Sequence, residues 1–396
     1  MLAPATQDAL ARAGSAIGSL ATSSNPDARW AMTASYAALG AVAAATATGR
    51  LRAWLWPQRL EDAALESLDA TDADETRKPL PALPKRLTRR PPIAWPTVAL
   101  ACVSVGTWAG AWVAYTQLKA PWYATLPVST TAAYWGFTVL HDAVHGSVSP
   151  KYKLLNYAVG QLAGVPLLAP LALFRSIHLT HHRFTNDHDS GPNGSSLDPD
   201  EWAGRGPWFL LPLRWATVMV YYCHFFSWQS ATRARNERTP PGALAADRRT
   251  TLEALSFGFA LVCALAKLHE RFGDAVVVCW LAPSLLAMTL LMAVFDYLVH
   301  RPHVVPFRVD PYKATHAVSA FGCVDHPAWN ALWLSQNMHL LHHAFPWAPF
   351  TAYPEIWRAV GAEFLARGAR AVPVLVWDAP AAFEELSDPD AFKKRA

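Results

Sequence analysis

The chain has 396 residues, of which 52% are hydrophobic and only 16% are charged. Soluble domains carry about 25% charged residues, so this composition is typical of a membrane protein. The net charge of +4 gives no support for nucleic-acid binding, and the five cysteines form no CxxC pair, which argues against an iron–sulfur site or a disulfide framework.

The first 92 residues are predicted to form an extension ahead of the catalytic part. Residues 30–48 are uncharged and rich in alanine, so they are a candidate extra membrane segment. Residues 57–92 begin acidic and end basic and proline-rich, a composition that rarely packs a core. We therefore expect a polar linker, then a membrane catalytic domain at 93–376, then a polar tail at 377–396.

Four apolar stretches are predicted to cross the membrane as two helical hairpins. Residues 97–118 and 122–140 are separated by a tight turn, and residues 252–268 and 275–299 by a short polar one. Such short connections join antiparallel helices, so each hairpin leaves and returns on the same side. The predicted fold class is an all-α integral membrane protein with a four-helix transmembrane bundle.

Two further stretches are interpreted as interfacial or shallow. Residues 154–174 are interrupted by glycines and prolines, and residues 207–228 are aromatic but carry Arg214 and His224. If neither crosses, all the histidine-rich groups share one side of the membrane with a basic loop. An excess of arginine marks the cytosolic or stromal side. The basic loop contains Arg233, Arg235, Arg238, Arg248 and Arg249.

Nine histidines on that side fall into three groups and one separate partner. The groups read HDAVH from 141, HLTHH from 178 and HLLHH from 339, and the partner lies in DYLVHRPH. Residues three and four apart share a helix face, so each group presents converging imidazoles. Neutral imidazole is the commonest metal ligand, and this many indicates two metals. The predicted ligands are His141, His145, His178, His181, His182, His300, His339, His342 and His343.

The residues around these ligands leave some roles open. His303 competes with His300 for the same position. Asp296, one turn earlier, is a candidate for orienting a ligand or holding a metal-bound water, or is simply polar at a helix end. Asn337, just before the third group, has the same two alternatives. The remaining histidines are interpreted as surface or ordinary packed residues: His188, His224, His269, His316 and His326.

Imidazole suits zinc, copper, iron and nickel, so the ligand type leaves the metal open. The predicted site lies at the mouth of an apolar helix bundle, which fits oxidation of a lipid C–H bond. That chemistry requires a redox metal and dioxygen, and zinc has no redox chemistry. The sequence contains no HExxH zinc-protease motif, no GxGxxG before a helix and no GxSxG.

The motifs HDAVH, HLTHHRFTND with the later LDPD, and QNMHLLHH resemble the three histidine boxes of the integral-membrane fatty acid desaturase and hydroxylase superfamily. The resemblance covers about residues 93–355. Within it, FDYLVHRPH followed by QNMHLLHHAFPWAPF is most similar to the cyanobacterial-type β-carotene hydroxylase branch. This sequence differs from that branch at two places. Val299 occupies the position where the branch has proline, and a Gly/Ser/Asn-rich insertion lies between Asp187 and Asp198.

The resemblance implies that the nine histidines hold two irons, which use O2 and two electrons to oxidise an unactivated C–H bond of a long lipophilic substrate. It implies an external electron donor, of ferredoxin or cytochrome b5 type. We expect a carotenoid or lipid hydroxylase, with an acyl-lipid or fatty acid desaturase as the alternative. A non-redox zinc-binding membrane protein is a further alternative. Endoplasmic reticulum, plastid and bacterial inner membrane all stay open.

Overall fold

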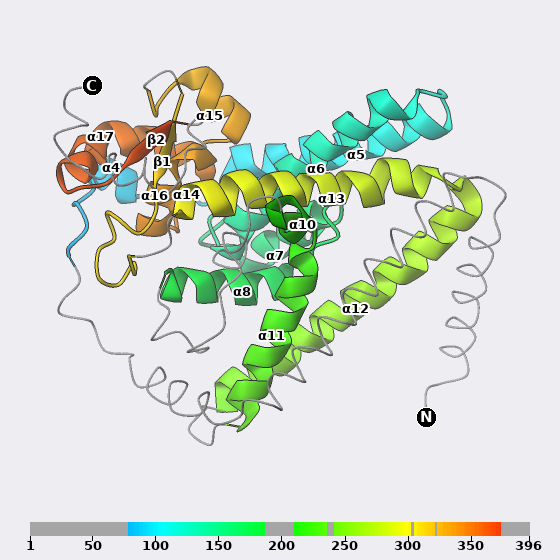
Figure 1. Cartoon of the computed structure of the whole chain (residues 1–396), viewed down its shortest axis with the longest axis horizontal. Coiled ribbons are helices and arrows are strands. Elements are labelled where there is room, and N and C mark those ends of the chain that lie inside the picture. Colours follow the sequence, from blue (N-terminus) through cyan, green and yellow to red (C-terminus); the bar gives the residue numbers. More distant parts are fainter. Residues whose placement is uncertain (1–77, 187–209, 236–240, 302–304, 321–322, 374–396) are drawn as a thin grey trace.

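The computed structural model describes residues 78–186, 210–235, 241–301, 305–320 and 323–373. This part of the chain is mostly helical (Figure 1), and a short parallel sheet pairs β1 (Ala317–Ser319) with β2 (Ala371–Pro373). The candidate segment 30–48, most of the 57–92 linker and the 377–396 tail lie outside the described residues.

The first predicted hairpin is formed by α5 (Trp95–Thr116) and α6 (Trp122–Val144). The turn between them contains Lys119 with φ 58°, and the Ser104 hydroxyl donates to the Ala132 carbonyl at 2.8 Å where the two helices touch. Helix α6 runs beyond the predicted end at 140, because the first helix-ending glycine is Gly146, with φ 69°. The HDAVH group therefore lies in the last turn of a long helix.

The last long helix is a continuous run with two widened, π-helical stretches. It consists of η2 (Val277–Leu281), α13 (Ala282–Leu291), η3 (Met292–Tyr297) and α14 (Leu298–His300). Pro283 has no N–H to donate to the Cys279 carbonyl one turn earlier. The Trp108 indole of α5 donates to that carbonyl instead, at 2.9 Å. The helix is locally widened just before Pro283, and the carbonyl that this proline leaves free accepts a hydrogen bond from another helix.

The glycine- and proline-rich stretch 154–174 forms α7 (Lys153–Gly164), a turn, and the start of α8 (Leu171–Phe184). The turn is buried against the last long helix, since Trp280 donates to the Val165 carbonyl and Ser284 to the Leu167 carbonyl, both at 2.8 Å. Non-helical backbone near a membrane needs such partners. The turn holds α8, which carries the HLTHH group, against the helix that ends at His300.

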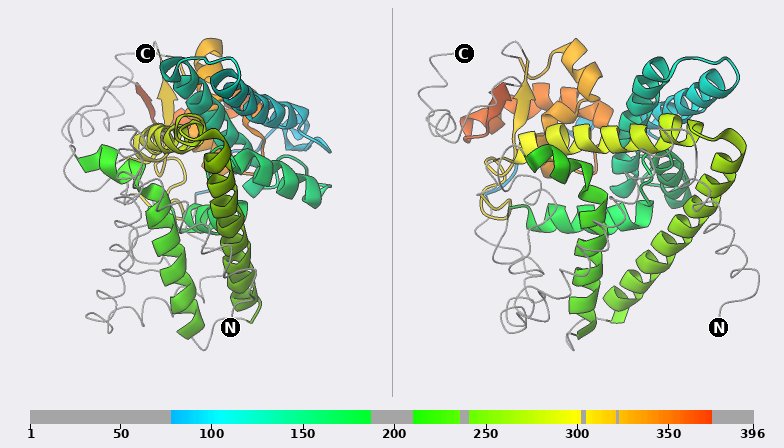
Figure 2. Two further views of the ribbon diagram at one scale, coloured as in Figure 1. Left: turned by 90° about the vertical axis from the view of Figure 1, so that its right-hand side faces the viewer. Right: turned by 45° about the vertical axis from the view of Figure 1, so that its right-hand side comes forward.

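The aromatic stretch 207–228 is described from residue 210 and forms α10 (Leu211–Ala216) and part of α11 (Val218–Arg235). Helix α12 (Pro241–Phe272) begins earlier than the predicted 252. Its N-terminal part lies beside α11, where Arg233 and Asp247 form an ion pair at 2.7 Å (Figure 2). That pair fastens the ends of the two helices together.

Helix α12 differs from the prediction of a packed second hairpin. It diverges from the turn that joins it to the last long helix (Figure 1), and none of its most apolar stretch is buried in the protein. In lipid, apolar helix faces have no hydrophobic reason to pair with each other, which is why apolar composition alone does not specify the pairing. Among the described residues, three helices are long and apolar enough to cross a membrane: Trp95–Thr116, Gly242–Phe272 and Val277–His300.

The C-terminal part, together with one short helix from the start of the described chain, forms a cap over the end of the last long helix. A second apolar core joins Tyr312, Leu341, Ile356 and Phe364, and Lys78 pairs with Asp310 at 2.5 Å on its outside. This core holds the segment with the third histidine group in place. The cap contains α4 (Lys85–Thr88), α15 (Pro327–Trp333), η4 (Gln336–Met338), α16 (His339–Ala344), η5 (Phe350–Ala352) and α17 (Tyr353–Ala366).

Candidate metal centre

All nine predicted ligands come together where α6, α8, α14 and α16 meet, and they divide into two groups. In each group, the candidate ligand atoms lie within 4.8 Å of one another. His300 belongs to the second group, whereas its competitor His303 lies outside the described residues. The first group contains His141, His145, His178, His182 and His342, and the second contains His181, His300, His339 and His343.

The paired histidines of the second and third motifs explain why there are two groups. His181 and His182 are neighbours in α8, yet they belong to different groups, and so do His342 and His343 in α16. Successive residues on an α-helix point about 100° apart, because a turn takes about 3.6 residues. Each HH pair therefore faces two centres at once, and the two centres share the same two helices.

The Nε2 atoms converge at spacings that suit a metal. His182 Nε2 lies 2.7 Å from His342 Nε2, and His178 Nε2 lies 2.9 Å from His145 Nε2. Two imidazole nitrogens at right angles on one metal, with bonds of about 2.1 Å, are about 3.0 Å apart. The first group therefore has the nitrogen spacing of a coordination shell.

Hydrogen bonds alone cannot satisfy the second group. His343 Nε2 lies 3.1 Å from that of His300, 3.0 Å from that of His339 and 3.2 Å from that of His181. One Nε2 carries at most one proton, so it cannot donate to three neighbours. In the first group, both ring nitrogens of His141 are buried without a hydrogen-bond partner. The residues present thus fit two metal ions.

The electrostatics of the site keep these imidazoles neutral. Burial, together with neighbouring imidazoles, holds the pKa of His178, His182, His342 and His343 well below the ordinary value. Burial first, and the nearby Arg175 guanidinium second, lower the pKa of His145 to about 3. A neutral imidazole keeps a lone pair for a metal, so the site is suited to cations at physiological pH.

The two residues predicted to support the ligands act differently from each other. The ring Nδ1 of His300 lies 2.8 Å from the backbone carbonyl of Asp296, so Asp296 orients this ring through its main chain. Asn337 is fully buried, but its amide nitrogen donates to the Val324 carbonyl at 2.9 Å and to Asn330 at 3.2 Å. These contacts make Asn337 a support of the loop before α15.

His316, interpreted from sequence as an ordinary residue, lies between two of the ligand-bearing segments. Its backbone N–H donates to the Val299 carbonyl at 2.8 Å, and its carbonyl accepts from Leu340 N–H at 3.3 Å. Its ring Nε2 meets the Arg301 carbonyl. No spacing in the sequence marks this residue, because its partners are brought to it only by the folded cap.

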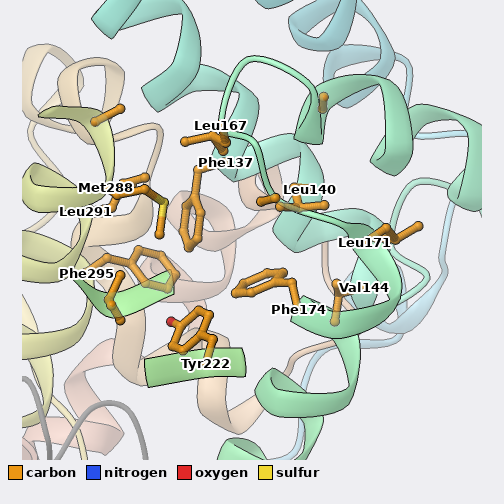
Figure 3. Close-up of a cluster of buried hydrophobic side chains, with 14 of the residues drawn as sticks. Phe137, Leu140, Val144, Leu167, Leu171, Phe174, Tyr222, Met288, Leu291 and Phe295 are labelled. Atoms are coloured by element: carbon orange, nitrogen blue, oxygen red, sulfur yellow. The ribbon is translucent and has the colours of Figure 1, made fainter. Parts of the chain in front are cut away.

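An apolar wall closes one side of the centre, and Figure 3 shows the hydrophobic side chains that form it, among them Phe137, Phe174 and Phe295. The Phe295 ring lies 4.6 Å from that of His339 and 5.0 Å from that of His141, measured between centroids. Phe137 stacks on His141 at 5.8 Å, and Phe174 stacks on His178 at 5.1 Å. Phe137 is buried, whereas Trp135, two residues before it in α6, is half-buried. The two histidine groups thus face a hydrocarbon-like surface.

The other isolated histidines stay apart from both groups. His269 contacts the Gly273 carbonyl at 3.1 Å at the end of α12, and His224 lies against Tyr221 with ring centroids 6.2 Å apart. Neither they nor His326 belong to either group. His188 lies outside the described residues.

Comparison with known proteins agrees with this geometry. The chain matches the fatty acid desaturase family over residues 119–373, and it belongs to that family. Its relatives belong to the membrane desaturase and hydroxylase superfamily.

Three relatives illustrate the range of the superfamily. An sn-1 oleoyl-lipid 12-desaturase of Picosynechococcus sp. is 28% identical over 240 residues, covering 57% of this chain and 65% of that protein. An sn-1 acyl-lipid omega-3 desaturase (ferredoxin) of Synechocystis sp. is 25% identical over 221 residues, covering 54% and 60%. A beta-carotene ketolase of Paracoccus sp. is 28% identical over 220 residues, covering 55% and 72%. The match therefore spans less than two thirds of the length of each of these two desaturases.

Proposed function

We propose that this chain is a membrane-bound di-iron desaturase that acts on acyl chains of lipids. The observation that carries the proposal is the pair of histidine groups that converge through Nε2 beside a wall of phenylalanines. The relatives favour desaturation over the carotenoid hydroxylation expected from the DYLVHRPH motif, since one is named an oleoyl-lipid desaturase and another an acyl-lipid desaturase, beside one beta-carotene ketolase.

The two histidine groups would each hold one iron. Bound there, the irons supply the activation of O2 that removal of hydrogen from an unactivated carbon requires. The chain itself contributes neutral, preoriented imidazoles, a buried site and an apolar surface. Phe137, Phe174 and Phe295 exclude water and hold a hydrocarbon segment against the side of the centre that they line.

The proposed topology places four helices in the bilayer: α5, α6, α12 and the run from Val277 to His300. The contact between Tyr115 at the end of α5 and Asp274 in the second turn, at 2.7 Å, supports placing both turns on the same side. The histidine groups then lie at the opposite, cytosolic or stromal side, with α8 and α16 outside the membrane core. This arrangement keeps the metal site next to lipid without burying its ligands in it.

An external donor supplies the two electrons, and a ferredoxin-type protein is our proposal, because one relative is named for ferredoxin. The basic loop is a candidate surface for an acidic donor, but within it Arg233 is paired with Asp247 and Arg249 with Glu253, each at 2.7 Å. Arg238 lies outside the described residues. Arg235 and Arg248 are the remaining described members of that loop to test at such a contact.

Expression in a lipid-producing host, with mass spectrometry of its lipids, tests the proposed function. We expect the host to make acyl chains that are two mass units lighter because of one new double bond. A host that expresses the His343→Ala variant should make no such desaturated chains. Hydroxylated carotenoids without new double bonds would support the carotenoid reading instead. A purified protein that holds zinc alone and yields neither product would support the zinc-binding alternative and contradict the proposal.

A further inference from the structure

Two hydroxyl groups lie at the outer nitrogens of the paired histidines in α16. The Tyr353 hydroxyl lies 3.0 Å from His342 Nδ1, and the Thr185 hydroxyl lies 3.3 Å from His343 Nδ1. Both side chains are buried, at 1% exposure each. Neither residue was singled out in the sequence, because each approaches its histidine from another element.

The other contacts of these hydroxyls determine the direction of the hydrogen bonds. Tyr353 OH donates to the Ala348 carbonyl at 3.1 Å, and Thr185 Oγ1 donates to the His181 carbonyl at 2.7 Å. A hydroxyl has one hydrogen, so each can only accept from its imidazole. The proton of both rings is thereby placed on Nδ1, and both Nε2 atoms keep a bare lone pair toward the centre.

We propose that Tyr353 and Thr185 are positioning residues that hold His342 and His343 in the metal-binding tautomer, one for each of the two metal ions. The inference rests on the metal centre of the proposed function. His342 belongs to the first group and His343 to the second, so each hydroxyl serves a different ion. Partners of this kind fix the ring orientation and raise the basicity of a ligand histidine.

The main chain provides the same arrangement for a third ligand. The Asp296 carbonyl can only accept, so the contact at 2.8 Å places the proton of His300 on Nδ1 as well. At His342 and His343, the carbonyls of Ala348 and His181 are already occupied by the hydroxyls, which then accept from the rings in their place. Because both hydroxyls are buried, solvent water cannot take the place of either one as the acceptor for its histidine ring.

The test uses the purified full chain, loaded with ferrous iron under argon, and measures iron per chain during titration with a chelator. We expect Tyr353→Phe and Thr185→Val each to release one iron at about 10- to 100-fold lower chelator concentration than the unmodified chain. Thr185→Ser keeps the hydroxyl and should restore retention. Tyr312→Phe is the matched tyrosine control, since Tyr312 is also fully buried but donates to the Pro79 carbonyl.

Double variants separate this role from a general loss of structure. His339→Ala removes a ligand of the second ion, so adding Thr185→Val should weaken the remaining iron little, whereas adding Tyr353→Phe should release it. Loss of the remaining iron to the same extent in the two double variants would overturn the inference, as would wild-type iron retention in both single variants. An unmodified chain that holds fewer than two irons would instead overturn the proposed metal centre.

Discussion

The histidines that form the centre differ from the other histidines in where they lie and in what their rings contact. The nine members converge through buried nitrogens, whereas His269 contacts a carbonyl at the end of α12. If the proposed metal centre is correct, removing a member opens a coordination position and leaves a cavity in a tightly packed site. Removing His269 changes one hydrogen bond far from either group.

His182→Ala and His343→Ala should therefore lower turnover by more than about 100-fold and reduce the iron bound per chain, because each removes a ligand outright. His269→Ala should leave both quantities within about twofold of the unmodified enzyme. Desaturated lipid and iron content, measured on the same preparations, check this. Comparable losses in all three variants would contradict the assignment of the ligands.

His316 makes the metal-free protein sensitive to acid. Burial lowers its pKa from 6.5 to about 4. Between pH 6.5 and about 4, His316 binds a proton in the unfolded chain but stays neutral in the folded chain. The stability contributed by a neutral His316 is therefore present above pH 6.5 and is lost as pH falls toward 4. The full shift corresponds to about 3 kcal/mol.

His316→Gln keeps a donor for the Arg301 carbonyl and has no charge to gain. The melting temperature of this variant, in detergent and without metal, should fall less between pH 7 and pH 4.5 than that of the unmodified chain. Parallel pH profiles for the two proteins would show that His316 does not contribute in this way. All other residues are the same in the two proteins, so the difference between their profiles isolates His316.

Close backbone contacts at the non-helical turns help to fix the positions of the helices. The turn between α7 and α8 passes so close to its own helix end that a β-carbon at Gly164 would lie 2.3 Å from the Ala169 carbonyl oxygen. Gly106 in α5 has no atom within 4 Å of the same position. Substitution by alanine therefore causes a steric conflict at Gly164 and none at Gly106, so the two variants form a matched pair.

Gly164→Ala should destabilise the fold by roughly 1–3 kcal/mol, since backbone must move to admit the methyl group. Because the turn positions α8, iron binding should weaken in the same variant. Gly106→Ala should be neutral or slightly stabilising, as alanine favours helices. Melting temperatures of the two variants in detergent check this. A tolerated Gly164→Ala would show that the turn is not tightly packed.

The sequence predicts the parts of the structure that are encoded locally. Histidine spacing within each motif is a helical pattern, so the nine candidate ligands and their convergence follow from it. The divergence of α12 does not follow, because apolar composition is the same for a helix that faces lipid and one that faces protein. Tyr353 and Thr185 are also missed, because no local sequence pattern links either residue to its histidine. Thr185, for example, lies 158 residues before His343 and meets it only in the folded chain.

For the whole molecule, the proposed topology places both helix-connecting turns across the bilayer from the metal centre. Single cysteines at Lys119 and at Arg358, in a chain whose native cysteines are replaced, should react with an impermeant maleimide from opposite sides of sealed vesicles. Arg358 lies in α17, close to the third histidine group along the chain. Labelling of both positions from the same side would contradict this topology.

The central claim is that the two histidine groups hold two iron ions side by side between α8 and α16. Crystals of the iron-loaded protein, measured with X-rays on both sides of the iron absorption edge, test it most directly. The account predicts two separate iron peaks, one among the first group with His342 and one among the second with His343. A single peak, or peaks that appear only at the zinc edge, would contradict it.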